Sequence, residues 1–396
     1  MKLKQSPDDF VVEEQTEVVP TAQGDYAFYR LDKVGWTTVD ALQAVRTRWN
    51  LDTRRLSFGG LKDRHARTSQ YFTIFGGPRR NLTHDRIKVI YLGQVKAPYT
   101  SVDIRSNAFT VTLRAITVTS KPVIVAAIRE VDRVGVPNYF DDQRFGSVGD
   151  GSAFVAREMV FGRFEEALRL ALTLPYEHDR GAQKREKEIL RRFWGDWPAC
   201  RTKLPSGHAR RSVEYLVHNS TDYRGAVARL RPELQGLYLS AYQSYLWNRI
   251  LAQWLMNHFP TNRLVTVRNK LEELPAPNDL PGDLQNPWES LSVPFPSARL
   301  KLDPGSEWYP IMEKVLGEEQ LTLSGMKIPG LRKPFFSKGE RAGSIRPTEF
   351  MSEFGPDEKQ PGQEKLLLKF KLPRGSYATV LVKRITAATP GWHPSQ

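Results

Sequence analysis

The residues of greatest chemical interest form a short charged loop near the start of the chain. Asp63 is a single carboxylate between Lys62 and Arg64, and His65 and Arg67 follow it. Such a carboxylate stays ionised, because nearby positive charge favours its charged form. It can act as a nucleophile or a general base, while the cations bind phosphate groups. An ordinary surface salt bridge fits the same pattern, so the loop alone leaves both interpretations open.

Other enzyme signatures are absent from the sequence. It contains no Walker-type phosphate loop, no Gly-x-Gly-x-x-Gly opening a helix and no Gly-x-Ser-x-Gly nucleophile turn. Cys200 is the single cysteine, and no Cys or His pair has the spacing of a metal site. Asp141 and Asp142 are adjacent acids, which keeps a metal-dependent nuclease as one alternative. Besides that nuclease, two interpretations remain: an RNA enzyme that needs no cofactor, and an RNA-binding protein without chemistry.

The composition favours a polyanionic partner. The 396 residues include 58 Lys and Arg against 44 Asp and Glu, a net charge of +14. A field of this sign attracts nucleic acid. A membrane surface is the weaker alternative, because no stretch approaches the roughly 20 apolar residues of a spanning helix. Residues 1–10 are polar and lack the apolar core of a signal peptide. We therefore expect a cytoplasmic RNA-binding protein.

Strands and two helices must position the charged loop. Thr37 or Thr38 can cap a helix that runs to about Trp49, and Gly135 is placed to end a helix over 123–134. Gly59 and Gly60 break the strand before Asp63 and permit a close approach of backbone or ligand. β-branched and aromatic residues predict strands over 10–14, 26–31, 54–58, 70–75, 86–95 and 109–116.

The composition changes after the first 150 residues. Residues 151–335 are predicted to be mainly helical, with helices over 164–174 and 237–259 and an irregular connection over 270–310. Strand character returns at 365–372, and a helix over 376–385 with Ser376 as its cap follows. The tail, 390–396, is expected to be loose.

A final strand so far from the others indicates a discontinuous domain. We expect an α+β fold with a mixed or antiparallel sheet, in which 1–148 and 338–396 form the catalytic domain. Residues 149–337 would be a large, mainly helical inserted domain. Its segment 180–211 carries ten Lys and Arg against three acids and is interleaved with Phe193, Trp194 and Trp197. This segment is either an RNA contact or a solvated helix face.

Six stretches resemble, in the same order, the motifs of the TruD family of tRNA pseudouridine synthases. The charged loop reads Gly-Leu-Lys-Asp-Arg-His-Ala at 60–66, and a later loop reads Asn-Tyr-Phe-Asp-Asp-Gln-Arg-Phe-Gly at 138–146. Any one motif alone would be weak evidence, whereas six in order argue strongly against chance similarity. The matching stretches are 3–14, 60–68, 107–110, 136–146, 240–248 and 372–379.

The resemblance implies an activity and a set of roles. Enzymes of this family cut the N-glycosidic bond of a uridine in RNA, rotate the uracil and rejoin it through carbon 5. Asp63 matches the nucleophilic aspartate, and whether it attacks the ribose or acts on the 2′ proton stays open. Lys4 matches a basic residue that would orient Asp63 or neutralise developing charge. Phe109 matches an aromatic that stacks on the flipped base, and Asn107 would hydrogen-bond the base or ribose.

The remaining expected substrate contacts come from the same matches. They border the pocket, flank the nucleophile or lie in a loop near the cleft: Phe10, Lys62, Arg64, Asn138, Phe140, Gln143, Arg144 and Tyr377. Taken singly, Phe10, Phe109 and Phe140 also fit core packing. Ser106 stands where the family usually has Gly, and Asp141 and Asp142 put negative charge in a loop expected to approach RNA.

The resemblance also implies the partners. The expected substrate is tRNA or another structured RNA, and uridine 13 of tRNA is the family's usual target. No cofactor, metal or membrane is expected, and a monomer is the default. The alternative is an RNA-binding or RNA-folding factor of the same fold with little or no catalysis.

Overall fold

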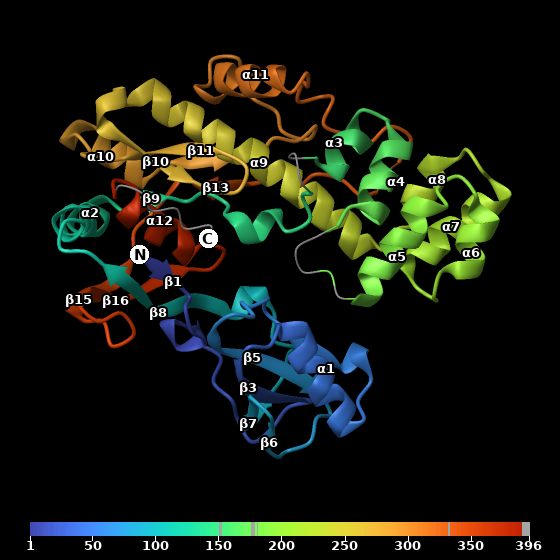
Figure 1. Ribbon diagram of the computed structural model, residues 1–396, viewed down its shortest axis with the longest axis horizontal. Coiled ribbons are helices and arrows are strands. Elements are labelled where there is room, and N and C mark those ends of the chain that lie inside the picture. Colours follow the sequence, from blue (N-terminus) through green and yellow to red (C-terminus); the bar gives the residue numbers. More distant parts are fainter. Residues whose placement is uncertain (150–152, 176–178, 180, 332, 390–396) are drawn as a thin grey trace. The chain divides into compact units, whose positions relative to one another are not determined.

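The computed structural model describes residues 1–149, 153–175, 179, 181–331 and 333–389 (Figure 1). The chain divides into two compact units. The first comprises 1–138, 278–285 and 344–396, and the second comprises 139–277 and 286–343. The assignment of 1–148 with 338–396 as a catalytic domain and of 149–337 as an insertion stays a prediction.

The first unit is built on one mixed sheet, in agreement with the predicted α+β class. The central strand order is β15-β16-β8-β2-β5-β3-β7-β6, with β1 paired to β8 and β4 paired to β5. β2 and β5 run parallel, and the other pairs are antiparallel. The strands are β1 (Lys2–Leu3), β2 (Phe10–Thr16), β3 (Tyr26–Val34), β4 (Leu56–Phe58), β5 (Arg67–Phe75), β6 (Leu82–His84), β7 (Ile87–Val95), β8 (Ile104–Ile116), β15 (Thr348–Pro356) and β16 (Glu364–Pro373).

The end of the chain joins the sheet begun by its start. β16 pairs along β8, with Phe370 opposite Phe109 and Leu372 opposite Asn107. On its other side β8 pairs with β2, where Glu14 stands opposite Asn107. The prediction that distant parts of the chain share one sheet is therefore confirmed. This pairing places the Asn107–Phe109 segment inside the sheet, between β16 and β2.

Three helices cover the sheet of the first unit. α1 (Thr38–Trp49) packs its apolar stripe on β3, β5 and β7, whereas α2 (Lys121–Val134) and α12 (Ala378–Thr386) pack on β2, β8 and β16. Thr37 caps α1, because its side chain accepts a hydrogen bond from Asp40 N. Gly135 ends α2 with a φ of 75°, a left-handed conformation that glycine adopts without strain. Both predicted helix boundaries are confirmed.

Three local predictions were wrong. Residues Thr53–Arg55 form a 3-10 turn capped by Asp52, so the strand begins only at Leu56. Tyr377, not Ser376, is the N-cap of α12, because its backbone is still extended. The supposedly irregular stretch 270–310 holds β11 (Glu273–Pro277), which pairs with β10 (Leu264–Arg268), as well as α10 (Gly282–Glu289) and β12 (Ser292–Pro294), which pairs with β13 (Glu340–Ala342). The tail, 390–396, lies outside the described residues.

The second unit is mainly helical. Its long helix α9 (Pro232–His258) is apolar around most of its circumference and carries the fully buried side chains of Tyr242, Trp247 and Leu251. A helix of this kind forms the interior of its domain. The other helices are α3 (Val155–Val160), α4 (Phe164–Thr173), α5 (Gly181–Arg192), α6 (Trp197–Lys203), α7 (His208–His218), α8 (Tyr223–Ala228) and α11 (Trp308–Glu318). Among the residues with described structure, no helix has the length and apolarity to cross a membrane.

Candidate active site

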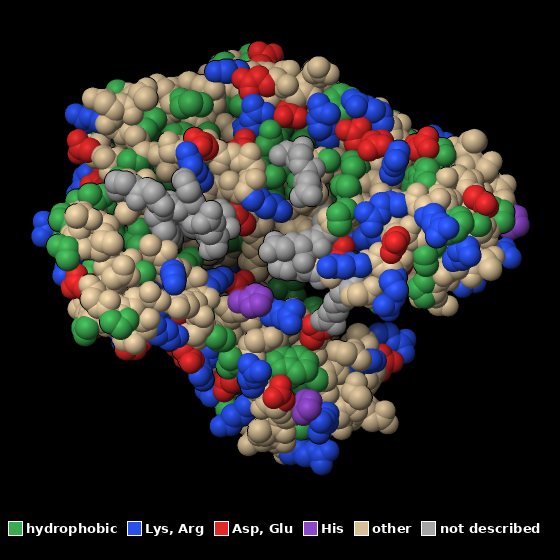
Figure 2. Space-filling view, in the orientation of Figure 1, with side chains coloured by type: hydrophobic (Ala, Val, Ile, Leu, Met, Phe, Trp, Pro, Cys, Tyr) green, Lys and Arg blue, Asp and Glu red, His purple; other side chains and the backbone are tan. Residues whose placement is uncertain are grey.

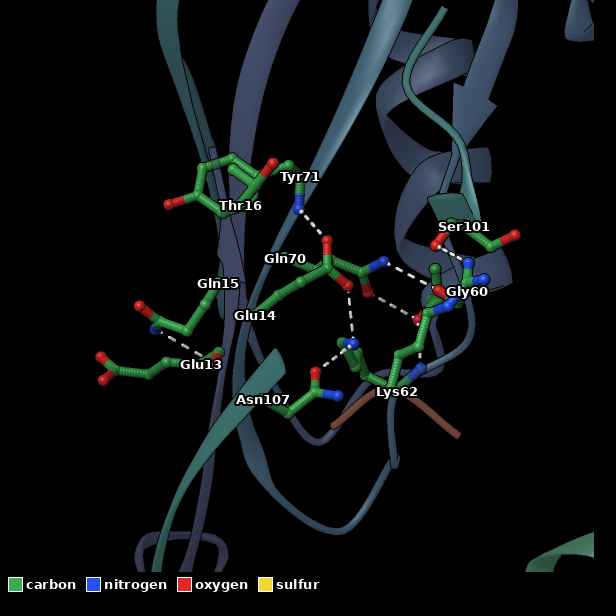
Figure 3. Close-up of polar contacts among 12 residues, drawn as sticks. Glu13, Glu14, Gln15, Thr16, Gly60, Lys62, Gln70, Tyr71, Ser101 and Asn107 are labelled. Atoms are coloured by element: carbon green, nitrogen blue, oxygen red, sulfur yellow. Dashed lines mark hydrogen bonds and ion pairs between the residues drawn. The ribbon is translucent and has the colours of Figure 1, made fainter. Parts of the chain in front are cut away.

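The charged loop is anchored to the first unit at several points. Gly59 lies so close to β8 that a Cβ atom there would come within 2.6 Å of Ile104 Cδ1, which explains the glycine. Gln70 on β5 donates to Gly60 O at 3.1 Å (Figure 3). Lys62 N donates to Thr38 Oγ1, at the start of α1, at 2.9 Å. These contacts fix the loop between β5 and the first turn of α1.

Lys4 contacts the carboxylate of the loop directly. Its Nζ donates to Asp63 Oδ2 at 2.8 Å, and each side chain is 25 % exposed. Lys4 has a φ of 55°, in the left-handed region that costs a non-glycine residue free energy. The N-terminal segment is held by Asp9, which is buried and ion-paired to Arg114 at 2.8 Å. The fold therefore places the ammonium of Lys4 against the carboxylate of Asp63, and both side chains stay partly exposed to solvent.

Lys62, next to Asp63, belongs to a second polar cluster. Its Nζ lies 2.6 Å from Glu14 Oε2 and donates to Asn107 Oδ1 at 2.7 Å (Figure 3). An ammonium only donates hydrogen bonds, so it fixes the amide oxygen of Asn107 toward Lys62 and turns Nδ2 away. Glu14 is also held by Tyr71 N and Tyr99 Oη, at 3.1 and 2.9 Å. Asn107 is thus locked in one orientation.

Three phenylalanine rings lie in a row next to Lys4. Its Nζ lies 4.1 Å from the centroid of the Phe10 ring, within range of a cation–π contact. Phe10 meets Phe109 edge to face at 6.2 Å, and Phe109 stacks on Phe370 at 5.4 Å. Phe109 is buried, with 8 % of the residue exposed. The structure thereby links Asp63, Lys4, Phe10 and Phe109 in one continuous chain of contacts.

Three other predicted site residues belong to the first unit. Arg64 is exposed, and its Nε donates to Gly35 O at 3.4 Å. Asn138 is buried at the end of the first unit. Tyr377 is half-buried at the start of α12.

Three predicted contacts belong to the second unit. Phe140 is buried against Trp247, edge to face at 5.4 Å, and its main chain exchanges two hydrogen bonds with the side chain of Asn248. Arg144 donates to Ser240 Oγ at 2.8 Å, whereas Gln143 is exposed. Phe140 and Arg144 therefore have well-defined partners within their own unit.

The neighbouring acids, Asp141 and Asp142, also belong to the second unit. Asp142 Oδ1 accepts a hydrogen bond from Lys270 N at 2.7 Å, and Asp141 is buried. Over the described ranges, no group of three His, Cys, Asp or Glu side chains could hold a metal ion.

Comparison with known proteins decides the family. The family model of tRNA pseudouridine synthase D (TruD) matches residues 1–269 and 288–385. The chain belongs to the TruD family. It is accordingly a pseudouridine synthase, an isomerase that modifies tRNA.

Individual relatives cover nearly the whole chain. A probable tRNA pseudouridine synthase D 2 of Methanocaldococcus jannaschii is 29 % identical over 97 % of this chain and 91 % of its own length. The tRNA pseudouridine synthase D of Aquifex aeolicus is 26 % identical over 97 % of this chain and 98 % of its own. A crystal structure of the TruD protein of Methanosarcina mazei superimposes with a TM-score of 0.70 at 26 % identity, covering 97 % and 93 % of the two chains.

Two buried residues of this TruD protein were missed as parts of the site. Glu14 follows Phe10 and Val12 on the buried face of β2, and Lys33 follows Tyr29 and Leu31 on the buried face of β3. In both strands the alternation of side chains places a charged residue where an apolar one is expected. That violation of the pattern is the sequence signal that could have identified them.

Lys33 lies against the charged loop. Its Nζ donates to the main-chain oxygens of Trp36, Asp63 and Lys62 at 2.8, 2.9 and 3.4 Å. The side chain is buried, with 1 % of the residue exposed. Burial lowers the pKa of Lys33 to about 8, and the charge of Asp63 partly opposes this effect.

Proposed function

We propose that Asp63 is the nucleophile with which this TruD protein converts a uridine of tRNA to pseudouridine. The observation that carries the proposal is the direct contact of Lys4 with Asp63, 2.8 Å long, beside the strand that holds Asn107 and Phe109. An ionised carboxylate held by a cation is ready to attack the ribose or to act on its 2′ proton. Uridine 13 is the position that we propose as the target.

The neighbouring residues suit a flipped uridine. A base within folded RNA must leave its stack before its glycosidic bond is accessible, which costs a few kcal/mol. Stacking on an aromatic ring returns about 1–3 kcal/mol per base, and Phe109 is the ring we assign to this role. The Nδ2 of Asn107, directed away from Lys62, would donate to the uracil or to the ribose. Phe10 and Lys4 would close the side of the pocket next to Asp63.

The chemistry requires no group beyond the RNA and the protein. If Asp63 attacks the ribose, its carboxylate oxygen bonds to C1′ as the bond from C1′ to N1 breaks, and the uracil leaves as an anion. If Asp63 instead takes the 2′ proton, a C1′–C2′ double bond forms as the uracil leaves, and the proton later returns to C2′. The uracil turns and its C5 bonds to C1′, which displaces the carboxylate in the first case. The hydrogen at C5 then leaves as a proton and N1 takes up a proton, so uridine and product have the same composition. Lys4 would stabilise the carboxylate of Asp63 before the attack and the negative charge of the uracil while it is detached. We place this reaction in the cytoplasm and expect the protein to act as a monomer.

Basic surface supports tRNA as the partner. In the view of Figure 2, Lys and Arg side chains lie over the region of α4, α5 and α7 in the second unit. One pocket of about 650 Å³ there is lined by His208, Arg210, Arg211 and Arg231, together with Glu214. Arg210 is paired with Glu214 at 3.0 Å, so Arg211 and Arg231 are the better candidates for phosphate contact.

Tritium release from RNA labelled at uracil C5 tests the proposal. The wild-type protein should release tritium from a tRNA transcript, and Asp63→Asn should bind the same transcript but release none. If both proteins bind equally and neither releases label, the chain is an RNA-binding or RNA-folding factor instead. Strand cleavage that a chelator abolishes would favour the nuclease alternative with Asp141 and Asp142.

A further inference from the structure

Lys33 occupies a buried position at which an apolar side chain would cost less desolvation free energy. It lies on the face of β3 that Ala27, Tyr29 and Leu31 use to pack against α1. Its neighbours across the sheet are Thr68 on β5 and Ile87 on β7, and neither is charged. Burying an ammonium carries a desolvation cost, and replacing buried charge by apolar groups is often neutral or stabilising. Stability of the sheet alone therefore does not account for Lys33.

Hydrogen bonds of Lys33 connect two segments, the residues just before α1 and the charged loop. An ammonium has three donors, and Lys33 directs them to Trp36 O, just before α1, and to Lys62 O and Asp63 O. The distances of 2.8 and 2.9 Å to Trp36 and Asp63 are those of well-formed bonds, and the 3.4 Å to Lys62 is weaker. The main chain of Asp63 is thereby tied to the strand that supports it.

Two lysines thus hold Asp63 from different sides. Lys4 contacts its carboxylate, whereas Lys33 contacts its carbonyl oxygen. A carboxylate can be aimed only as well as its own backbone is fixed, and a displacement of about 1 Å can slow a reaction by about a hundredfold. The charge of Lys33 also acts on Asp63 from inside the protein, where water screens it little.

We propose that Lys33 is a positioning residue for the pseudouridine synthase reaction, which fixes the backbone of Asp63 and supplies a buried positive charge beside it. This inference rests on the proposed role of Asp63. The alternative is that Lys33 serves only the stability of the first unit. If Lys33 is a positioning residue, its replacement slows the chemical step even when the protein is folded and RNA is bound. If Lys33 serves only stability, the rate of that step does not change.

Replacement of Lys33 by methionine separates these possibilities. The matched control is Arg384→Met, because Arg384 is also a buried cation of the first unit, 1 % exposed, with Asn278 Oδ1 at 3.2 Å. Tritium release would be followed in single turnovers with enzyme in excess, the Kd for the same transcript by filter binding, and folding by thermal unfolding. Lys33→Met should lower the single-turnover rate constant by about ten- to a hundredfold and leave Kd within about threefold. Arg384→Met should leave both within about threefold.

The pH dependence of the wild-type rate gives a second readout if Lys33→Met does not fold. The charged groups that face Lys33 are Asp63 and Lys62. Raising the pH through about 8 removes the charge and one donor from Lys33. The deprotonation of Lys33 does not itself destabilise the fold, because between about pH 8 and pH 10.5 the unfolded chain holds a proton on this lysine that the folded chain has released, so the contribution of Lys33 to stability rises with pH. The rate constant should fall over this range, and the fall should be absent from Lys33→Gln.

Each outcome decides between the possibilities. A rate constant of Lys33→Met within about threefold of wild type, or one that falls only as RNA binding falls, would overturn the inference. A wild-type rate that is flat through pH 8, or a decline that persists in Lys33→Gln, would also overturn it. If the wild-type protein releases no tritium, the proposed function itself fails. If wild type is active, Asp63→Asn is inactive and Lys33→Met is normal, only the role of Lys33 fails.

Discussion

Lys4 and Asp63 lie 59 residues apart in the sequence, and their side chains meet at 2.8 Å. Lys4 precedes the first long strand of the sheet, and Asp63 lies in the loop between β4 and β5. Neither residue belongs to a regular element. Buried groups hold both segments in place. The ion pair of Asp9 and Arg114 holds the segment that contains Lys4, and Lys33 holds the loop that contains Asp63. The contact is therefore set by the scaffold beneath it.

Loss of the Lys4 ammonium should slow the reaction. A hydrogen bond to a charged group is worth about 1.5–3 kcal/mol, so Lys4→Met should lower the rate constant for tritium release by about ten- to a hundredfold. Lys4→Arg should keep part of the activity, because it retains the charge. Lys2→Met is the control, since Lys2 is exposed and lies two residues away. A Lys4→Met enzyme within about twofold of wild type would contradict this role.

Phe109 should matter for catalysis as well as for stability. Phe109→Leu and Phe370→Leu remove stacked rings from the same core, so both should lower the free energy of unfolding by a similar amount, about 1 kcal/mol. Only Phe109→Leu should also lower the rate constant, by about tenfold, because it alone is assigned to stack on the base. Denaturant unfolding and single-turnover tritium release measure the two effects. Equal rate losses in both variants would reduce Phe109 to a core residue.

Charge reversal in the basic pocket should weaken RNA binding without affecting chemistry. The double variant Arg211→Glu with Arg231→Glu should raise the Kd for tRNA by about tenfold and make its salt dependence shallower, since about two phosphate contacts are lost. The rate constant at saturating enzyme should not change. Lys301→Glu with Lys314→Glu alters the net charge equally at exposed positions outside this pocket. If both pairs weaken binding alike, the pocket has no special role.

The second unit should lose stability as the pH rises through the neutral range. Burial raises the pKa of Glu272 from 4.5 to about 8, and Arg249 only partly opposes this. Between these values the folded protein holds a proton that the unfolded chain has released, so the stabilising contribution is complete below pH 4.5 and is lost as the pH rises through about 8.

Glu272→Gln should reduce this pH dependence, because the amide resembles the protonated carboxyl and cannot ionise. The fall in Tm between about pH 5 and about pH 8 should shrink by a few degrees in this variant. Glu273→Gln is the control, because the Glu273 side chain is 61 % exposed and pairs with Arg268. Identical pH profiles for wild type and Glu272→Gln would show that Glu272 does not titrate in this range.

Many helix and strand boundaries could be predicted from residues close together in the sequence. Thr37 as the cap of α1 and Gly135 as the end of α2 depend on hydrogen bonds and backbone angles within a few residues, and both were predicted correctly. The 3-10 turn at Thr53–Arg55 and the pairing of β10 with β11 were missed. The turn depends on a single cap at Asp52, and the hairpin depends on partners several residues away.

The family, the candidate nucleophile and the class of fold could be predicted from the chain alone, because motif residues and element patterns lie within short segments of sequence. Which charged side chains contact one another became visible only in the folded protein. In the fold, Lys62 contacts Glu14 and Asn107, and Lys4 contacts the carboxylate of Asp63. The buried ammonium of Lys33 contacts the main chain of Asp63. The reason is physical: burial and strand pairing bring together side chains from distant segments, and no single segment contains that information.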